Sequence, residues 1–526
     1  MIKKELAEIL KKAWGNDVFL DYPVNNQFGD LATNFAIIHK EKSANDLVGL
    51  IPKIDWLEKI EIAGAGFINF TIKPAKLVDE IDREIDKINK TMVIDYSAPN
   101  IAKPFGIGHL RSTNIGQAIY NLYQYLGWNC VGVNHLGDWG TQFGKLIVAI
   151  KKWGDKNLAE MTVEDLEKIY VRFHQEAETD LELEEHGRDW FAKLENGDAE
   201  AREIWQKCIE ISLKEFDKVY EKLGVKIDYA LGESFYTDKM PAMIEELKNK
   251  GLVTESQGAK IIEFEKMPPA MVIKSNGTTT YFTRDMATLK YRVERWQPDL
   301  LIYEVGSDQE LHFKQVFATA KKLGIETETV HVAHGMIRWK DGKFSTRSGK
   351  TIHLDEVIEK AKEEARKIAP ENNEEKIEAV AIGAIKFSDL SADPKKDIIF
   401  DWEKVMSMEG SSGPYLQYTY ARCMSVLEKI KEPTNNIFSD LNLEEKNLLI
   451  ELIKFNEKVV EAAERFNPAV LAEYLLSIAR KYNEFYAKHR IVGEASEQWR
   501  GWLTQKTAEK LKTGLTLLGI KPVLEM

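Results

Sequence analysis

The residues best suited to chemistry in this chain lie in one short stretch that combines glycines with a histidine. Gly108 and His109 follow Pro104 and directly precede a segment in which apolar residues recur at helical spacing. The first turn of a helix presents free backbone amides and the positive end of the helix dipole, and both favour a phosphate group. A turn with a purely structural role would contain the same residue types, so this pattern alone leaves both interpretations open.

Apolar runs on either side of this stretch predict the strands that would position it. Residues 91–96 precede the turn, and residues 128–134 follow the helix. The order strand, turn, helix, strand is the unit from which nucleotide-binding sheets are built. A further apolar run begins at Leu300 and ends in polar residues, which is where open α/β sheets place their ligands. The helix itself has one apolar face, formed by Leu110, Ile115, Ile119, Leu122 and Leu126.

Length and composition set broad limits. At 526 residues, with 44% hydrophobic and 30% charged content, the chain has the composition of a soluble protein with about three or four domains. No run approaches the ~18 apolar residues that span a bilayer, and the first residues predict a structural helix rather than a targeting segment. The net charge of −12 argues against nonspecific nucleic-acid binding, although a specific RNA partner needs only a local positive surface.

The three cysteines, Cys130, Cys208 and Cys423, lie far apart and form no Cys-x-x-Cys pair. This distribution argues against a disulfide framework or a zinc site and favours a reducing cytoplasm. The histidines also show no metal-ligand spacing, so we expect no tightly bound metal.

The sequence of the central stretch resembles one family closely. Residues 97–113 and 134–144 resemble the arginyl-tRNA synthetases, which are class I aminoacyl-tRNA synthetases, and the first segment contains the family's His-x-Gly-His motif. Residues 343–350 resemble the second nucleotide motif, the counterpart of the Lys-Met-Ser-Lys-Ser loop. The resemblance implies a multidomain α/β protein with a Rossmann-like catalytic domain.

The same resemblance divides the chain. A small α+β N-terminal domain that touches the tRNA elbow is expected over residues 1–89, and the catalytic domain over 90–396. Long, charged helical patterns over 153–225 fit a connective insertion. From 397 to 526 the pattern predicts helices only, as in the all-α anticodon-binding domain of the family.

By resemblance, the reaction is arginine activation: the arginine carboxylate attacks the α-phosphate of ATP, and donors and cations must surround the triphosphate. Gly106 replaces the first histidine of the first motif, and Thr346 and Arg347 replace Lys-Ser in the second. Lys103 occupies the place of an upstream lysine that resembles a substitute. The catalytic residues implied are Lys103, His109, Lys343, Ser345 and Arg347, and the ATP-binding residues are Gly106, Gly108, His109, Gly306, His312, Gly335 and Met336.

The arginine side chain needs carboxylates that bind a planar, permanently charged guanidinium. By resemblance, Glu233 and Asp285 take that role, Tyr281 walls the pocket, and Asn100 and Gln309 hold the amino and carboxylate end. On a helix, positions 281 and 285 lie on one face. The alternatives are that Asp285 forms a cap or pairs with Arg284 or Lys290, and that the glutamate belongs to a plain turn.

For tRNA, the resemblance points to Phe67 and Asn69 at a D-loop base and to Tyr415, Tyr418 and Met526 at the anticodon. Aromatic rings stack on unpaired bases while amides bind the base edge. These aromatic residues could equally belong to the core, and the asparagine could be a polar residue on a strand face. The N-terminal extension is also shorter than the family leads us to expect.

The sequence therefore predicts an arginine–tRNA ligase that uses ATP with Mg²⁺, L-arginine and tRNA for arginine. We expect tRNA-dependent activation, a cytoplasmic location, a monomer and no membrane contact. One rival is another class I enzyme such as the cysteinyl type, whose zinc-thiolate pocket the three scattered cysteines do not supply. The other is a non-catalytic tRNA-binding paralogue, for which Gly106 is the main argument.

Overall fold

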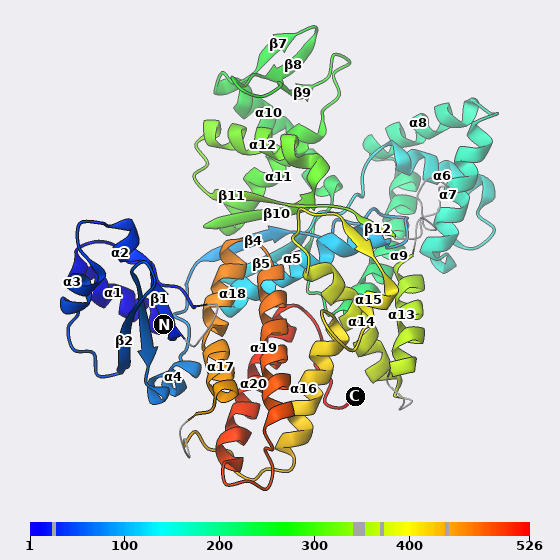
Figure 1. Ribbon diagram of the computed structural model, residues 1–526. Helices are drawn as coiled ribbons and strands as arrows, with labels where there is room; N and C mark the ends of the chain where they lie inside the picture. Colours follow the sequence, from blue (N-terminus) through cyan, green and yellow to red (C-terminus); the bar gives the residue numbers. More distant parts are fainter. Residues whose placement is uncertain (24–27, 340–352, 369–372, 437–440) are drawn as a thin grey trace.

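A computed structural model describes residues 1–23, 28–339, 353–368, 373–436 and 441–526. Figure 1 shows three parts: an N-terminal part, a central sheet with helices around it, and a bundle of helices that ends the chain. None of the helices within these ranges is long and apolar enough to cross a membrane.

The N-terminal part packs helices on a small antiparallel sheet. Helix α1 (Ile2–Trp14) buries Ile2, Leu6, Leu10 and Trp14, which share one face at four-residue spacing, and ends at Gly15 in the left-handed conformation. The sheet order is β1-β3-β2, and a turn with Gly64 and Gly66 at positive φ joins β2 to β3. The other elements are β1 (Leu31–Thr33), α2 (Phe35–Ile38), α3 (Ala44–Gly49), β2 (Leu57–Ala63), β3 (Phe67–Ile72) and α4 (Pro74–Ile81).

The central sheet has five parallel strands in the order β11-β10-β4-β5-β6. Met92, Val93 and Ile94 of β4 are fully buried, as expected for a strand covered on both faces. The predicted strand, helix, strand unit is confirmed by β4, α5 and β5. The elements are β4 (Thr91–Asp95), α5 (Ile107–Tyr125), β5 (Asn129–Asn134), β6 (Tyr229–Ala230), β10 (Leu300–Gly306) and β11 (Glu328–His334).

Between β5 and β6 the chain forms the helices that the charged pattern predicts. Two of them begin with a recognisable signal: Thr162 caps α7 with a capping box, and Asp198 caps α9. Gly224 then ends α9 in the left-handed conformation. These elements are α6 (Thr141–Trp153), η2 (Leu158–Glu160), α7 (Val163–Ala177), α8 (Glu182–Glu195) and α9 (Ala199–Leu223).

Between β6 and β11 the chain supplies the helices of the candidate site. It also forms a three-stranded antiparallel sheet, β7-β8-β9, which the sequence analysis did not predict. The elements are η3 (Glu233–Lys239), α10 (Met240–Asn249), β7 (Thr254–Ser256), β8 (Ala259–Ile262), β9 (Ala270–Ile273), α11 (Tyr281–Trp296), η4 (Ser307–Gln309) and α12 (Glu310–Leu323).

The last part of the chain is mainly helical, with one correction to the prediction of helices only after residue 397. Strand β13 pairs in parallel with β12, so a strand lies inside that range. The prediction failed because so short a strand depends on a partner some sixty residues earlier rather than on its own pattern. The elements are β12 (Ile337–Trp339), α13 (Leu354–Ile368), α14 (Glu374–Leu390), β13 (Ile398–Phe400), α15 (Trp402–Val405), α16 (Gly413–Leu427), α17 (Leu443–Ile453), α18 (Phe455–Glu464), α19 (Ala469–Lys488) and α20 (Glu497–Leu517).

Candidate active site

Three of the residues predicted to bind ATP lie at the start of α5. Gly106 is the N-cap of α5, and Gly108 and His109 lie in its first turn. The Gly106 backbone N–H donates to Nδ1 of His109 at 3.3 Å, so the other ring nitrogen, Nε2, carries the hydrogen. Burial lowers the pKa of His109 to about 4, and nearby Lys103 lowers it as well. His109 is therefore a neutral hydrogen-bond donor at neutral pH.

Open space surrounds the rest of this turn within the described part of the chain. Lys103 and Gly108 are exposed, and a Cβ on Gly108 would meet no heavy atom within 4 Å. His353 pairs through its backbone with Gly106, and its Nε2 lies 3.7 Å from Oε2 of Glu167. The fold thus places a histidine residue beside the glycine that replaces the first histidine of the motif. The sequence analysis did not single out His353, because no local pattern connects it to residue 106.

The loop between β4 and α5 is held in an unusual conformation. Ser97, Ala98 and Ala102 have φ of 78°, 46° and 59°, a region that costs about 1–3 kcal/mol per residue outside glycine. Hydrogen bonds hold this conformation: the backbone N–H of Ser97 donates to Ser112 Oγ at 2.9 Å, and that of Ala102 donates to Ser212 Oγ at 2.8 Å. A loop fixed in this way, at the carboxyl end of a central strand, favours a functional role.

Asn100, predicted to hold the amino and carboxylate end of arginine, is exposed in this loop. The Gly137 N–H donates to the carbonyl of Pro99 at 3.1 Å, and the Ile101 N–H donates to the carbonyl of Gly137 at 3.2 Å. A Cβ on Gly137 would approach Asn100 Oδ1 to 2.2 Å. Residue 137 must therefore be glycine for the two loops to lie this close with the asparagine in place.

Helix α11 carries two of the residues predicted to form the arginine pocket. Tyr281 and Asp285 lie on one face of the helix, as predicted, and Tyr281 is 70% exposed. Asp285 Oδ2 lies 2.5 Å from Nε2 of His312, so the aspartate pairs with neither of the neighbours considered as alternatives, Arg284 and Lys290. The predicted ATP-binding histidine therefore contacts the arginine side of the site.

Glu233 reaches the same pocket from another element. Its backbone N–H donates to the carbonyl of Leu136 at 3.0 Å, and Ser234 donates to the Asp138 carboxylate from both its backbone N–H and its hydroxyl. Glu233 Oε2 accepts a hydrogen bond from Arg284 at 2.8 Å. Burial raises the pKa of Glu233 to about 7; Arg284 opposes that shift, while Asp285 and Asp138 add to it.

A buried ion pair fixes α11 against the sheet. Arg292, about two helical turns beyond Asp285 on α11, lies 2.8 Å from Oδ2 of Asp95 at the carboxyl end of β4, and both side chains are buried. The guanidinium also lies 5.1 Å from the ring of Tyr303 on β10. Since breaking a buried pair of this kind is strongly destabilising, the pair fixes the helix that carries Asp285.

The carboxyl ends of β10 and β11 carry the other predicted nucleotide residues. Gly306 ends β10, and Gly335 and Met336 directly follow β11. His334 Nδ1 lies 2.8 Å from Oε1 of the buried Glu304. A Cβ on Gly335 would come within 2.7 Å of the facing backbone, whereas Met336 is 65% exposed at this edge.

The remaining predicted residues of the catalytic site are not all described. Gln309 is the last residue of η4 and is exposed next to α12, where His312 lies. Lys343, Ser345 and Arg347 lie outside the described residues. Among the residues that the structure does describe, no group of three His, Cys, Asp or Glu side chains could hold a metal ion.

An aromatic groove crosses the N-terminal part. Its cavity has a volume of about 510 Å³, and three exposed phenylalanines, Phe19, Phe28 and Phe67, line it. Asn69 lies at its floor and is buried, while Asn34 adds a second amide. Phe67 and Asn69 were predicted from the sequence. Phe19 and Phe28 were not, because they lie in a stretch that has no periodic pattern of apolar residues.

The tyrosines predicted at the anticodon are partly buried and hydrogen-bonded. The Tyr415 hydroxyl accepts from Asn483 Nδ2 at 3.0 Å, and the Tyr418 hydroxyl accepts from Arg422 at 3.0 Å. The guanidinium of Arg422 lies between the rings of Tyr418 and Tyr486, 4.7 and 5.1 Å from their centroids. The sequence analysis missed Arg422 and Tyr486.

The last predicted RNA-contacting residue is Met526, which is half-buried and packs against the core cluster that contains α13 and α14.

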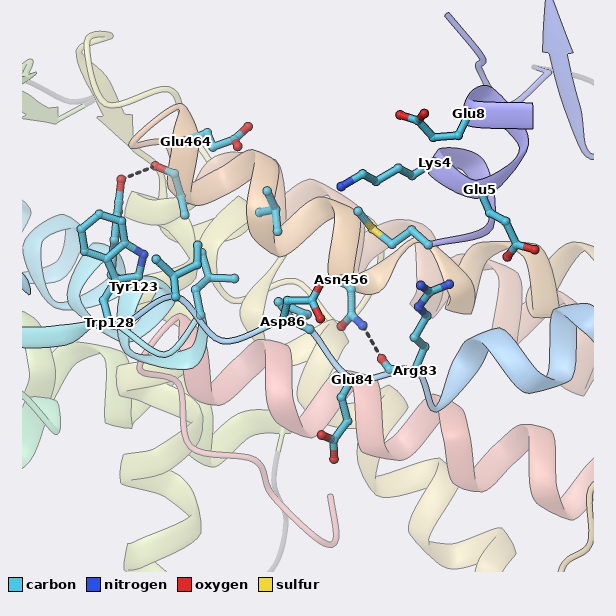
Figure 2. Close-up of a pocket in the computed structure, with 16 residues that line it drawn as sticks. Lys4, Glu5, Glu8, Arg83, Glu84, Asp86, Tyr123, Trp128, Asn456 and Glu464 are labelled. Carbon is cyan, nitrogen blue, oxygen red and sulfur yellow. Dashed lines mark hydrogen bonds between the residues drawn. The ribbon is translucent and has the colours of Figure 1, made fainter. Parts of the chain in front are cut away.

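A separate cavity of about 690 Å³ lies between α1, residues 83–88, α5 and α18 (Figure 2). Asn456 donates a hydrogen bond to the carbonyl of Arg83 at this cavity, 2.7 Å away. Carboxylates, including Glu5, Glu8 and Glu464, lie on its walls. None of the predicted site residues is among its described lining, so we assign it no part in the reaction.

Three family models match the chain in sequence order. Residues 1–72 match the arginyl tRNA synthetase N terminal domain, residues 74–402 match the class I (R) tRNA synthetase catalytic domain, and residues 416–526 match the DALR anticodon binding domain.

Curated relatives match over the whole length. An arginine–tRNA ligase from Halothermothrix orenii is 40% identical over 535 residues, covering 95% of this chain and 94% of that one. One from Clostridium acetobutylicum is 38% identical and covers 100% of both chains.

Solved structures agree with these matches. The crystal structure of the arginyl-tRNA synthetase from Plasmodium falciparum has a TM-score of 0.84 at 26% identity and covers 100% of this chain and 99% of that one. The Thermus thermophilus arginyl-tRNA synthetase, at 24% identity, shares the fold with a TM-score of 0.87 and covers 100% of both chains. By these family models and full-length matches, the chain belongs to the arginyl-tRNA synthetase family.

Proposed function

We propose that this chain is an arginine–tRNA ligase whose substrates are ATP, L-arginine and tRNA for arginine. The observation that carries this function is that Glu233 and Asp285 interact electrostatically, while the segment that binds the backbone of Glu233, residues 136–137, is hydrogen-bonded to the loop before α5. Two carboxylates suit a guanidinium, and a helix N-terminus suits a phosphate. The site thus combines the two recognition chemistries that arginine activation needs.

In the first step an arginine carboxylate oxygen attacks the α-phosphorus of ATP. The bond from that phosphorus to the bridging oxygen of pyrophosphate breaks, so that arginyl-adenylate and pyrophosphate form. His109 Nε2 and the amides of the first turn of α5 donate hydrogen bonds to the phosphates, and Lys103 adds positive charge. These groups act by positioning and by stabilising negative charge rather than by covalent chemistry.

Magnesium enters with ATP as part of the substrate. Lys343, Ser345 and Arg347, from the second nucleotide motif, surround the triphosphate. We assign Gly306, Gly335 and Met336 to the same nucleotide, because they lie at the carboxyl ends of β10 and β11, where sheets of this kind bind their ligands.

The amino acid lies with its guanidinium toward Glu233 and Asp285 and with Tyr281 as the wall of the pocket. Asn100 and Gln309 hold its amino and carboxylate groups. His312, paired with Asp285, fixes that carboxylate in place. Lysine lacks the planar set of donors that can bind two carboxylates at once, so the pocket favours arginine.

In the second step a terminal ribose hydroxyl of tRNA attacks the adenylate carbonyl, and AMP leaves. The exposed phenylalanines of the N-terminal groove suit stacking with an unpaired base, and Asn69 suits its edge. Tyr415, Tyr418 and Met526 serve at the anticodon. We also propose that arginine activation requires bound tRNA.

We propose that the chain divides into domains at residues 1–89, 90–396 and 397–526, with the insertion at 153–225. We also propose that the protein is a monomer and lies in the cytoplasm. The family matches cover most of each proposed part, although the catalytic match begins at residue 74 and the anticodon match at residue 416.

The decisive experiment is arginine-dependent ATP–pyrophosphate exchange with and without tRNA. Exchange that appears only with tRNA supports both the ligase and the coupling. Equal exchange without tRNA would refute the coupling alone. Silence in the wild type, with tRNA binding intact, would instead favour a non-catalytic tRNA-binding paralogue.

A further inference from the structure

Both carboxylates of the arginine pocket are already paired with basic groups of the chain. Arg284 forms an ion pair with Glu233, and the imidazole of His312 contacts the carboxylate of Asp285. The Arg284 guanidinium carbon also lies 5.6 Å from the centroid of the Tyr281 ring, the proposed wall of the pocket. The Arg284 guanidinium thus contacts Glu233 and lies near Tyr281, the same two residues that we assign to the guanidinium of the substrate.

The pairing of Arg284 is weak for a guanidinium. Only NH1 donates to Glu233, and Nε is buried without a hydrogen-bond partner among the described residues. A buried donor without a partner costs about 1–3 kcal/mol, whereas a guanidinium bound in bidentate fashion uses two donors at once. A free arginine that approaches both carboxylates can therefore form more hydrogen bonds at this place than Arg284 does.

Without a cation, Glu233 would not keep its charge. It is largely buried, and the charged groups that face it are Arg284 and Asp285 on α11 and Asp138 in the loop after β5. Burial and the two aspartates raise the pKa of Glu233, and Arg284 alone opposes them. Arg284 thus maintains an ionised carboxylate in the empty pocket.

We propose that Arg284 is a positioning residue that stands in for the guanidinium of the substrate: it holds Glu233 in the empty pocket and gives up that place when arginine binds. This inference rests on the proposed function, because it takes arginine as the ligand. Arg284 touches Glu233 rather than the reacting atoms, and it acts through the charge and orientation of that carboxylate.

The test compares the full-length wild type with Arg284→Ala and, as a matched control, with Arg295→Ala. Arg295 is an exposed arginine further along the same helix. The KM for arginine is measured by pyrophosphate exchange with tRNA present. At about pH 8.5, above the pKa of about 7 that Glu233 has in the wild type, we expect Arg284→Ala to lower this KM about fivefold, the factor that corresponds to about 1 kcal/mol for an ion pair.

As the pH falls toward 6, the advantage of Arg284→Ala should disappear and reverse, because Glu233 then takes up a proton more readily than in the wild type. Arg295→Ala should match the wild type at every pH. Arg284→Lys keeps a charge with fewer matched donors, and we expect an intermediate KM with a pH profile close to that of the wild type.

Methylguanidinium distinguishes a displaced Arg284 from a fixed one. If Arg284 leaves, methylguanidinium competes with arginine in Arg284→Ala far more strongly than in the wild type. If Arg284 stays in the occupied pocket as a structural partner, the substitution raises the KM at every pH and methylguanidinium lowers it again. The second result overturns the inference.

A failure of the proposed function would look different. The wild type would then show no arginine-dependent exchange, and calorimetric titration with L-arginine at about pH 8.5 replaces the kinetic comparison. Tighter binding of L-arginine to Arg284→Ala than to the wild type supports the stand-in role, and equal or weaker binding overturns it. Thermal melting of each variant shows whether it is folded.

Discussion

The two ends of the candidate active site differ in the charge of the groups that line them. The arginine end contains ionisable acids that are partly buried and paired with Arg284 and His312. The phosphate end contains a neutral imidazole, His109, at a helix N-terminus, with the exposed Lys103 beside it. In the empty protein the arginine end contains charged groups, whereas the phosphate end presents mainly neutral hydrogen-bond donors.

The difference follows from the ligands. A guanidinium is a permanent cation that needs ionised carboxylates in the ground state, and burial makes such charges costly unless they are paired. A triphosphate brings its own charge, so neutral donors in the right geometry suffice until the transition state. Four predictions test this contrast, beginning with the largest expected effect.

Asp285→Asn should be the most damaging change. It removes the charge that faces the guanidinium and weakens the contact with His312; we assign the loss of the ion pair with the bound guanidinium about 4 kcal/mol, within the range for charge pairs that binding buries. We expect kcat/KM for arginine to fall about 10³-fold, with the KM for ATP nearly unchanged. Asp238→Asn, at an exposed position of η3, is the control. An equal loss in both variants would contradict a special role for Asp285.

His109→Ala should act on kcat instead. Removal of one donor that stabilises developing charge costs about 10²-fold in rate. Because the imidazole makes no proposed contact with the amino acid, the KM for arginine should stay near the wild-type value. Steady-state exchange kinetics separate the two constants. A large rise in the KM for arginine would show that the two ends are not independent.

The pH dependence of the KM for arginine should differ from that of kcat. Glu233, with a pKa of about 7, must be ionised to bind a guanidinium, so the KM for arginine should rise about tenfold as pH falls from about 8 to 6. His109, with a pKa of about 4, stays neutral over this range and should add no step to the profile of kcat. Glu233→Gln, which cannot titrate, should abolish the rise. A profile that keeps the rise in this variant assigns it to another group.

Gly106→His should have the smallest effect. It restores the first histidine of the motif and adds one donor near the phosphates, worth about 0.5–1.5 kcal/mol for a typical hydrogen bond. We expect kcat to rise by at most about tenfold, with the KM for arginine unchanged. Paired with His353→Ala, the variant also tests whether the histidine beside Gly106 already supplies a donor. A fall in kcat would mean that the N-cap glycine is needed for its own conformation.

The regular elements were predictable where the pattern is local and long. The strand at 91–96, the helix with its apolar face from Leu110 to Leu126, and the charged helices of the insertion all appear in the structure. The sheet β7-β8-β9 was missed because its strands are only three or four residues long and are held by pairing with one another. Strand β13 was missed because its partner β12 is remote in sequence.

The sequence by itself determined the family, the unit of strand, helix and strand around Gly108, and the shared face of Tyr281 and Asp285, since these depend on residue types and on local spacing. Only the tertiary structure decided how the charges pair. Glu233 meets Arg284 across 51 residues, and Asp285 meets His312 across 27. Such pairs form because a sheet brings the ends of separate strands and the helices beside them to one edge, and no local pattern encodes that meeting.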